Sequence, residues 1–172
     1  MDSKISRKEI IIVFFLLALV AIVFFYKTFL MGLLPFPGDL LVSEYNPWKT
    51  YSYLEYNPGS FPNKAQYFDV IRQLYPWKTL IIDLLEKGEI PLWNPYNFSG
   101  SPFLANFQAA VFYPLNILYL VFSKITAWTI LVILQPVLAG FFTYLFTRKI
   151  GIGRVGSLLA SLAFSYSLFM TT

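Results

Sequence analysis

Two aspartates at matching places in a short internal repeat are the first candidates for acid–base chemistry. The sequence from Asp39 to Thr50, DLLVSEYNPWKT, is followed by a second copy from Asp69 to Thr79, DVIRQLYPWKT. In each copy the aspartate stands six residues before a tyrosine, and Pro-Trp-Lys-Thr follows. The turn that begins at Pro35 and the apolar neighbours of Asp39 would partly shield this carboxylate from water, which suits a general base.

The same two carboxylates have other uses. Two carboxylates in one loop could share a divalent cation, or could divide the acid and base roles between them. Alternatively, each aspartate caps a helix or a turn, because an apolar helical pattern follows both. We interpret the repeat as a local duplication with two similar turns. Asp39 and Asp69 are therefore the catalytic candidates, and no cofactor beyond this divalent cation is indicated.

The composition places the chain among membrane proteins. Of the 172 residues, 57% are hydrophobic and 13% are charged, and this charged share is about half of that in soluble proteins. Histidine and cysteine are absent, which removes the common zinc ligands, disulfides and the usual general base. Acid–base chemistry must therefore fall to Asp, Glu, Lys or Tyr. We expect membrane lipids, and no nucleic acid, among the partners.

Three cations in the repeat could bind a phosphate group. Lys49 and Lys78 follow the tryptophan of each copy, and Arg72 lies inside the second copy. Such side chains could hold a lipid phosphate, or could simply meet anionic headgroups at a membrane surface. The tryptophans beside the lysines could likewise serve only as interface anchors.

The residues from Gly88 to Asn116, GEIPLWNPYNFSGSPFLANFQAAVFYPLN, combine turn-forming and aromatic residues. Four prolines each remove a backbone donor and fix φ, which predicts a series of turns. The amide side chains would satisfy the backbone groups that such turns leave unpaired. We expect the loop to bury its rings in order to stay ordered, and these rings are Trp93, Tyr96, Phe98, Phe103 and Phe107. An ordered loop of this length is more often a site than a connector.

An apolar run near the N-terminus predicts a first membrane span over residues 10–34. Ile10 to Leu30 alone number 21 residues, enough to cross roughly 30 Å of hydrocarbon at about 1.5 Å per residue. No small-x-small cleavage site follows, which favours an anchor over a cleaved signal peptide. Residues 1–9 are basic and are expected in the cytoplasm, so residues 35–108 form an external loop.

The external loop should contain helices that lie along the membrane surface. From Asp69 to Lys87, apolar residues recur every three or four positions, as on one face of a helix. Pro76 interrupts this pattern, which predicts a bend or two short helices. Gly88 follows the pattern and is placed to end the helix.

Charge decides how the remaining apolar segments are arranged. Residues 109–123 are short for a span and are broken by a proline and an asparagine, whereas 126–147 form a convincing span that leads into the basic segment 148–154. If 109–123 also crossed, the basic segment would lie outside, against the positive-inside rule. We therefore expect 109–123 to be an interfacial or re-entrant helix, 148–154 to be a cytoplasmic loop, and 155–172 to be a third span in a chain that looks truncated.

Two features inside the predicted spans concern helix packing. Gln135 and Pro136 lie near the middle of the second span, where an amide and a kink should face a protein partner or a cavity rather than lipid. Ser157, Ser161 and Ser165 recur every four residues, which is typical of a small-residue packing seam.

The longer motifs resemble those of bacterial YfhO-like membrane proteins, which belong to the GT-C glycosyltransferase-like group. The resemblance rests on PGD at 37–39, on D-x-x-x-Q-x-Y-P-W at 69–77, and on G-E-I-P-L-W-N-P-Y-x-F-S-G-S-P-F-L-A-N-x-Q-A-A-V-F-Y-P-L-N at 88–116. With the helices that come after these motifs, it covers most of the chain.

This resemblance implies an all-α integral membrane protein, represented here by a GT-C-like N-terminal region with about three transmembrane helices and a large external first loop. GT-C proteins use an acidic residue of that loop to pass a sugar from a polyprenyl-phosphate donor to an acceptor on the outer face. The acceptor would be a cell-surface glycopolymer or glycan, and the location the bacterial cytoplasmic membrane. Asp39 stands where the acidic residue is expected, and Asp69 is the second candidate. The substrate-binding candidates are Lys49, Arg72, Lys78, Trp77, Trp93, Asn94, Asn106 and Gln108.

Two other classes of function stay open. A transporter of lipid-linked sugars would use the kinked span at Gln135 and Pro136 as its pathway. A non-catalytic relative would use the ordered loop to bind a glycan or a partner protein. The predicted spans carry no charge after Lys27, which argues against an ion-coupled transporter.

Overall fold

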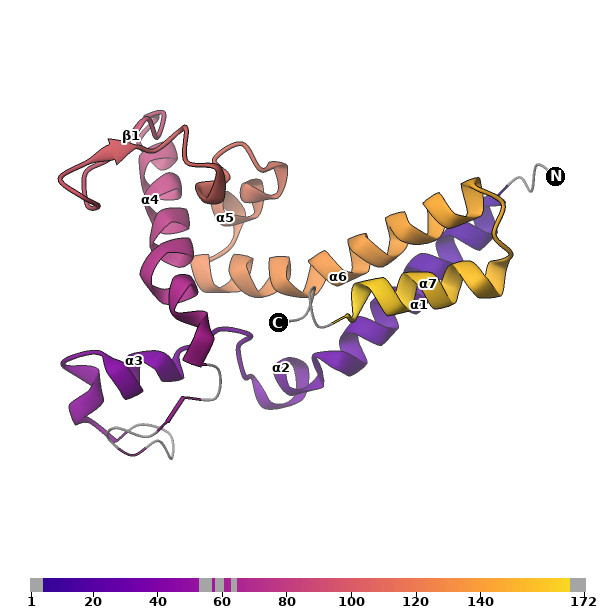
Figure 1. The fold of residues 1–172 in the computed structure, drawn as a ribbon, viewed down its shortest axis with the longest axis horizontal. Helices are drawn as coiled ribbons and strands as arrows, with labels where there is room; N and C mark the ends of the chain where they lie inside the picture. Colours follow the sequence, from indigo (N-terminus) through magenta and orange to yellow (C-terminus); the bar gives the residue numbers. More distant parts are fainter. Residues whose placement is uncertain (1–4, 53–56, 58–60, 63–64, 168–172) are drawn as a thin grey trace. The chain divides into compact units, whose positions relative to one another are not determined.

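The computed structural model describes residues 5–52, 57, 61–62 and 65–167, and these residues are mostly helical (Figure 1). The predicted all-helical fold class is thus confirmed at this level. The chain divides into two compact units, described here one at a time: unit 1 comprises residues 1–35 and 128–172, and unit 2 comprises residues 36–127. The ends of the predicted cytoplasmic terminus (1–4) and third span (168–172), and parts of the predicted external loop (53–56, 58–60 and 63–64), lie outside the described residues.

The elements follow one another along the chain with a single strand pair among the described residues. The helices are α1 (Arg7–Phe24), α2 (Tyr26–Met31), α3 (Asp39–Glu44), α4 (Tyr75–Glu86), α5 (Leu118–Val121), α6 (Lys124–Lys149) and α7 (Arg154–Ser165), and the strands are β1 (Trp93–Asn94) and β2 (Ser101–Pro102). Shorter helical turns are η1 (Trp48–Thr50), η2 (Ala65–Tyr67), the π-helical segment η3 (Val70–Leu74), η4 (Phe107–Ala109) and η5 (Pro114–Ile117).

Unit 1 is built from α1, α6 and α7, which run beside one another (Figure 1). Its apolar core is formed by Val13, Leu17, Ala21, Val137 and Tyr144. The range predicted for the second span, 126–147, lies within α6, and α6 continues through Pro136 without a break. The range predicted for the first span holds two helices, because α1 ends at Phe24 and α2 ends before Gly32, which adopts a left-handed conformation.

The serines of α7 form the packing seam that their spacing predicted. Ser157, Ser161 and Ser165 are completely buried. A Cβ atom added to Gly140 of α6 would lie 2.3 Å from the Ser165 Oγ and 3.2 Å from a methyl carbon of Leu17. Only a glycine allows the helices to approach this closely, as small residues do at helix interfaces in membranes.

The charged end of unit 1 is held by one glutamate. The Glu9 carboxylate accepts hydrogen bonds from Arg148 Nε at 2.9 Å, from Arg154 Nε at 3.1 Å and from the Tyr144 hydroxyl at 2.8 Å. Burial raises the pKa of Glu9, but the hydrogen bonds from Tyr144 and Arg148 and the nearby arginine charges outweigh it, so the pKa lies below its ordinary value. Ser6 caps α1 by accepting a hydrogen bond from the Glu9 N–H at 3.1 Å.

Gln135 lies on the exposed face of α6. Its side chain is exposed on α6, whereas the neighbouring Pro136 is buried. The Gln135 amide therefore does not face a cavity inside unit 1, and the other expectation, that it faces a protein partner, stays a prediction. The reason for the exposure is the helical period, because the seam residue Gly140 and the core residue Val137 set which face of α6 turns inward.

Unit 2 is organised around α4. Trp77, Ile81 and Ile82 of this helix are buried, together with Phe103 and Tyr119 from later in the chain. Trp77 and Phe103 meet edge to face with ring centroids 6.5 Å apart. This contact places the middle of the proline-rich loop against α4.

A glycine and a proline mark the two ends of α4. Gly88 ends the helix as expected: its N–H donates to Leu85 O at 3.0 Å and the Glu89 N–H donates to Leu84 O at 2.9 Å, which is a Schellman motif. Pro76, where a bend or two short helices were expected, lies in the first turn of α4, where no intrahelical donor is needed, and the pattern divides there into two helical segments. The π-helical segment η3 runs directly into α4.

Residues 109–123 do not form the single helix that was expected. The described chain there consists of the end of η4, a left-handed Ala110 with φ of 49°, and then η5 and the single turn α5. Pro114 starts η5, since its fixed φ suits a helix start but not a helix interior. The proline thus divides this apolar run into turns.

Among the described helices, α6 alone is long and apolar enough to cross a membrane, by length and composition. Of its most apolar 18-residue stretch, 28% is buried. α1 is 18 residues long and begins with the charged residues Arg7, Lys8 and Glu9. α7 is apolar and 12 residues long within the described chain.

Replacing Gly140 with leucine should destabilise unit 1. The added side chain would overlap Ser165 and Leu17, and overpacking of this kind costs about 1–3 kcal/mol. Thermal unfolding followed by circular dichroism would measure the loss. Gly153→Ala is the matched control, because a Cβ there meets nothing within 4 Å. Equal unfolding temperatures for Gly140→Leu and the unmodified chain would contradict the seam.

Candidate functional site

The candidate site is the chain between α4 and α6, and its first part is a short hairpin. β1 pairs with β2 in antiparallel fashion, with Trp93 opposite Pro102 and Asn94 opposite Ser101. Asn94 is buried, and its Oδ1 accepts a hydrogen bond from the Tyr96 N–H at 2.9 Å. An asparagine side chain that accepts a hydrogen bond from the backbone N–H two residues onward forms an Asx turn. The amide therefore builds the hairpin tip.

The hairpin tip holds three consecutive residues in the left-handed region. Phe98, Ser99 and Gly100 have φ values of 52°, 62° and 110°. A Cβ on Gly100 would lie 2.5 Å from the Trp93 indole nitrogen, so the indole ring lies directly against the Gly100 backbone. Non-glycine residues with positive φ are uncommon, and strained residues of this kind gather at functional sites.

Most rings of this loop are exposed, in contrast to the burial that was expected. Phe103 is buried, but Phe98 is 98% exposed and Phe107 is 93% exposed. Tyr96 and Trp93 are exposed as well. The expectation failed because the loop is stabilised by polar contacts and not by burial of its aromatic rings. The rings are left at the surface.

Lys78 of α4 provides the main polar anchor of the loop. Its Nζ donates to Ala109 O at 3.0 Å, to Ala110 O at 3.3 Å and to Asn116 Oδ1 at 3.0 Å. The Asn116 Nδ2 in turn donates to Ala110 O at 2.8 Å and to Val111 O at 2.9 Å. An ammonium has three N–H donors, so all of them are used within unit 2. Lys78 therefore holds the loop to α4 rather than offering a donor to a phosphate.

Burial changes the ionisation of this lysine. Removal from water lowers the pKa of Lys78 to about 8. At neutral pH the side chain is still mostly protonated. It keeps the third N–H that the three oxygen acceptors require.

The two aspartates occupy different environments in unit 2. Asp39 is half-buried and lies in the first turn of α3, directly after Gly38. Asp69 is exposed and stands immediately before η3, where its side chain makes no helix-capping hydrogen bond. The prediction that the repeat forms two similar turns is wrong, because Asn46 and Pro47 end the first helix whereas the second copy continues into α4. Of the two aspartates, Asp39 is the one more shielded from water.

The remaining sequence candidates divide between structural and exposed residues. Arg72 bonds the Tyr45 hydroxyl through Nε and lies over the Phe68 ring, 4.8 Å from its centroid, so this arginine joins the two copies of the repeat. Asn106 accepts a hydrogen bond from the Gln108 N–H at 3.1 Å and thereby caps η4. The side chains of Lys49 and Gln108 are exposed.

The structure adds two residues that the sequence analysis did not single out as site residues, Asn116 and Gly100. Asn116 is an amide in an otherwise apolar stretch, and this was the available signal that it would be buried with partners. Gly100 carried no signal, since its role depends on the position of Trp93. Across the described residues, no group of three or more acidic side chains is placed to hold a metal ion.

No protein-family model matches the sequence, and no match is found among curated proteins or solved structures. The resemblance to the YfhO-like family therefore stays a prediction that rests on the motifs, and the function has to be argued from the geometry of the two units.

Lys78→Met should destabilise unit 2 at neutral pH. The substitution leaves the buried acceptors at Ala109 and Asn116 without their donor, which costs about 1–3 kcal/mol. Lys49→Met is the matched control, because Lys49 holds the same place in the first repeat copy and is exposed, so its loss should cost less than about 0.5 kcal/mol. Urea unfolding of the two variants gives both values, and equal losses would contradict the anchor.

The difference between the unmodified chain and Lys78→Met should widen as the pH rises from 7 to about 10. The folded-state pKa of Lys78 is about 8 and the unfolded-state pKa is about 10.4, so within this window the unfolded chain binds more protons at this site. The contribution of Lys78 to the free energy of unfolding therefore increases with pH. A constant or shrinking difference in urea unfolding over this range would contradict the lowered pKa.

Gly100→Ala should loosen the hairpin. The new methyl group would both occupy the Trp93 ring position and strain a residue with φ of 110°. Gly88→Ala is the control, because Gly88 also has positive φ but has open space at its Cβ position. Hydrogen exchange of the peptide covering 93–102 should accelerate in Gly100→Ala and stay unchanged in Gly88→Ala. Unchanged exchange in both variants would contradict the close approach of Trp93.

Proposed function

We propose that the chain is the N-terminal region of a GT-C-like membrane glycosyltransferase. The protein transfers a sugar from a polyprenyl-phosphate donor to a glycan or glycopolymer on the outer face of the bacterial cytoplasmic membrane. Unit 1 supplies the membrane spans from α1 with α2, α6 and α7, and unit 2 is the external loop that carries the site. Each part of this proposal has its own support.

The membrane part is supported by the way unit 1 sorts its side chains. Beside its apolar core, the interior also holds polar and small groups such as Glu9, Arg148 and the three serines of α7. The exterior is apolar, and its most exposed large side chains include Phe15, Leu19, Val23, Phe142, Phe146, Val155 and Leu159. The helices of a soluble bundle differ in their outer faces, which are charged or polar. Helices that are apolar on their outer faces are suited to a lipid solvent.

The orientation is supported by the charges that the fold brings together. Arg148 and Arg154 both bind Glu9, which follows Arg7 and Lys8 at the start of α1. The basic residues of the N-terminus and of the α6–α7 connection therefore lie at the same end of unit 1. A single basic end fits a cytoplasmic N-terminus and three crossings.

The observation that carries the functional part is the ordered loop with exposed rings. Hydrogen bonds from Lys78, Asn94 and Asn116 hold the loop, while Phe98 and Phe107 stay almost fully exposed. Exposed rings on a fixed backbone can stack on the apolar faces of a sugar, or can enter the headgroup layer beside a lipid-linked donor. Rings that served only the core of unit 2 would be buried as Phe103 is.

The chemical step needs a base, and Asp39 is the better placed carboxylate. The Asp39 carboxylate takes the proton of the acceptor hydroxyl, whose oxygen attacks the anomeric carbon of the donor. The bond between the anomeric carbon and the phosphate oxygen breaks, and the lipid phosphate leaves with its negative charge. The exposed Lys49 stabilises that charge. Half-burial keeps Asp39 partly out of water, whereas Asp69 is exposed.

A second candidate function is binding without catalysis. The exposed rings would serve a glycan-binding loop equally well, and such a protein would need no base. The two functions differ in whether Asp39 matters once the loop is folded.

Asp39→Asn should abolish sugar transfer while leaving folding and membrane insertion intact. The amide has the shape of the carboxylate but takes no proton, and loss of a general base typically lowers the rate by about 10²–10⁴-fold. The measurement is transfer of radiolabelled sugar from a polyprenyl-phosphate donor in membranes that contain the protein expressed from its natural open reading frame. Glu44→Gln is the matched control, since it removes an exposed acid from the same helix α3.

The companion variant Asp69→Asn decides between the two carboxylates. We expect it to retain activity, and loss of transfer in Asp69→Asn alone would move the base to Asp69. Full transfer by both variants would exclude a carboxylate mechanism. Absence of transfer by the unmodified protein, with glycan binding that depends on Phe98 and Phe107, would favour the binding function.

A further inference from the structure

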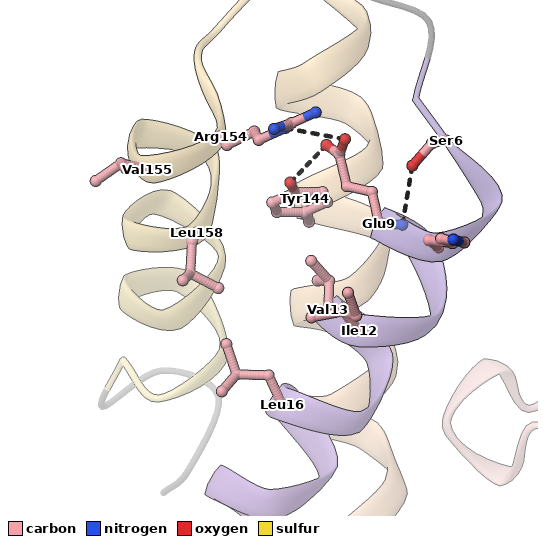
Figure 2. A pocket seen from close by; sticks show the side chains of 10 residues that line it. Ser6, Glu9, Ile12, Val13, Leu16, Tyr144, Arg154, Val155 and Leu158 are labelled. Carbon is pink, nitrogen blue, oxygen red and sulfur yellow. Dashed lines mark hydrogen bonds and ion pairs between the residues drawn. The ribbon is translucent and has the colours of Figure 1, made fainter.

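The charged end of unit 1 contains a cavity that the sugar-transfer proposal does not use. It has a volume of about 370 Å³ and lies between α1 and α7 (Figure 2). Glu9, Tyr144 and Arg154 line its polar end, and Ile12, Leu16 and Leu158 line its apolar part. Figure 2 shows the Arg154 side chain reaching across the top of the cavity toward the Glu9 carboxylate.

The charges around the cavity do not cancel. The Arg148 side chain is 6% exposed and the Glu9 side chain 8% exposed, so these two form a buried pair that neutralises the carboxylate. Arg154 also contacts Glu9 through Nε, but 72% of its side chain is exposed. Lys8 lines the cavity as well and is exposed. The cavity therefore has a surplus of two positive charges at its open, polar end.

The apolar part of the cavity opens toward the outer surface of unit 1. Ile12 is 65% exposed, and Val155, which also lines the cavity, is 74% exposed. A free inorganic anion would make no favourable contact with these apolar side chains. A molecule with an anionic head and a hydrocarbon tail would match both ends.

We propose that this cavity binds an anionic phospholipid, with its phosphate on Arg154 and Lys8 and the first part of an acyl chain along Ile12, Leu16 and Leu158. The assignment follows from charge complementarity at one end and apolar surface at the other. Arg154 keeps the Nη atoms of its guanidinium for the phosphate because its contact with Glu9 uses Nε. Basic pockets between transmembrane helices at the cytoplasmic side bind lipid headgroups in this way.

This inference rests on the membrane part of the proposed function and is independent of sugar transfer. The proposed donor acts at the outer face, whereas this cavity lies at the basic end assigned to the cytoplasm. The lipid bound here is thus a different molecule from the donor, and its role is to fix α7 against α1.

Native mass spectrometry of the detergent-solubilised protein tests the site. Phosphatidylglycerol should remain bound in preference to phosphatidylcholine, and Arg154→Gln should weaken its retention about fivefold, as expected for the loss of one cation at a membrane surface. Lys8→Gln should have a similar but separate effect. Lys149→Gln is the matched control: it removes one exposed positive charge from the end of α6 without altering the cavity lining, and retention should stay within about twofold.

A fourth variant tests the apolar part of the site. Leu158→Trp fills the cavity without changing charge, and it should reduce retention of phosphatidylglycerol while circular dichroism shows unchanged helix content. Retention that Leu158→Trp leaves intact would overturn the acyl-chain assignment. Equal losses in Arg154→Gln and Lys149→Gln would replace the site by a diffuse surface charge, and displacement of the lipid by glycerol phosphate at equal concentration would identify a free phosphate site instead.

Flotation with phosphatidylcholine vesicles separates this inference from the proposed function. Failure of the protein to float would contradict the membrane assignment of unit 1. Flotation together with no preference for phosphatidylglycerol would overturn the lipid site alone.

Discussion

The ammonium group of Lys78 is the interaction on which the candidate site depends. Without it, Ala109 O and Asn116 Oδ1 would lose the donor that Lys78 supplies, and Ala110 O would keep only its hydrogen bond from Asn116 Nδ2. These acceptors belong to a loop in which regular structure is limited to short helical turns and one pair of two-residue strands, so other backbone groups need partners from side chains. The half-buried ammonium of Lys78 donates to three of these acceptors, and Asn116 donates in turn to Val111 O. The shape of the loop is thereby set by a polar group inside unit 2.

In unit 1, as in unit 2, interactions between polar groups connect the elements in the interior. Glu9 joins α1 to α6 and α7 through Arg148 and Arg154, and the close contact between Gly140 and Ser165 joins α6 to α7 along the seam. In water this arrangement would be a poor source of stability, because the apolar outer faces stay exposed. In a lipid solvent, small residues and polar bonds are the main sources of helix association. The same interior also brings the basic residues to one end, so the packing of unit 1 and its proposed orientation have one cause.

How much the sequence predicted depended on whether a signal was local. Local patterns were sufficient for the helical class, for the end of α4 at Gly88 and for the serine seam of α7, because each depends on residues within a few positions of one another. The sequence failed where a long-range partner decided the outcome. Lys78 looked like a phosphate ligand until its acceptors, more than thirty residues later in the chain, were known. The catalytic candidates were found from spacing, but the different surroundings of Asp39 and Asp69 depend on the residues that come after each copy of the repeat.

The exposed rings gain their significance from the same polar framework. A loop that depended on its aromatic residues for order would have to bury them, and these rings would then be unable to meet a ligand. Because Lys78, Asn94 and Asn116 bear the structural role, Phe98 and Phe107 are held at the surface on a backbone that includes left-handed residues. Leaving such rings in water is unfavourable, at about 25 cal/mol for each Å² of apolar surface. Contact with a sugar face or with the headgroup layer would remove that cost. The exposed rings therefore suggest that unit 2 binds one of these surfaces when the protein functions.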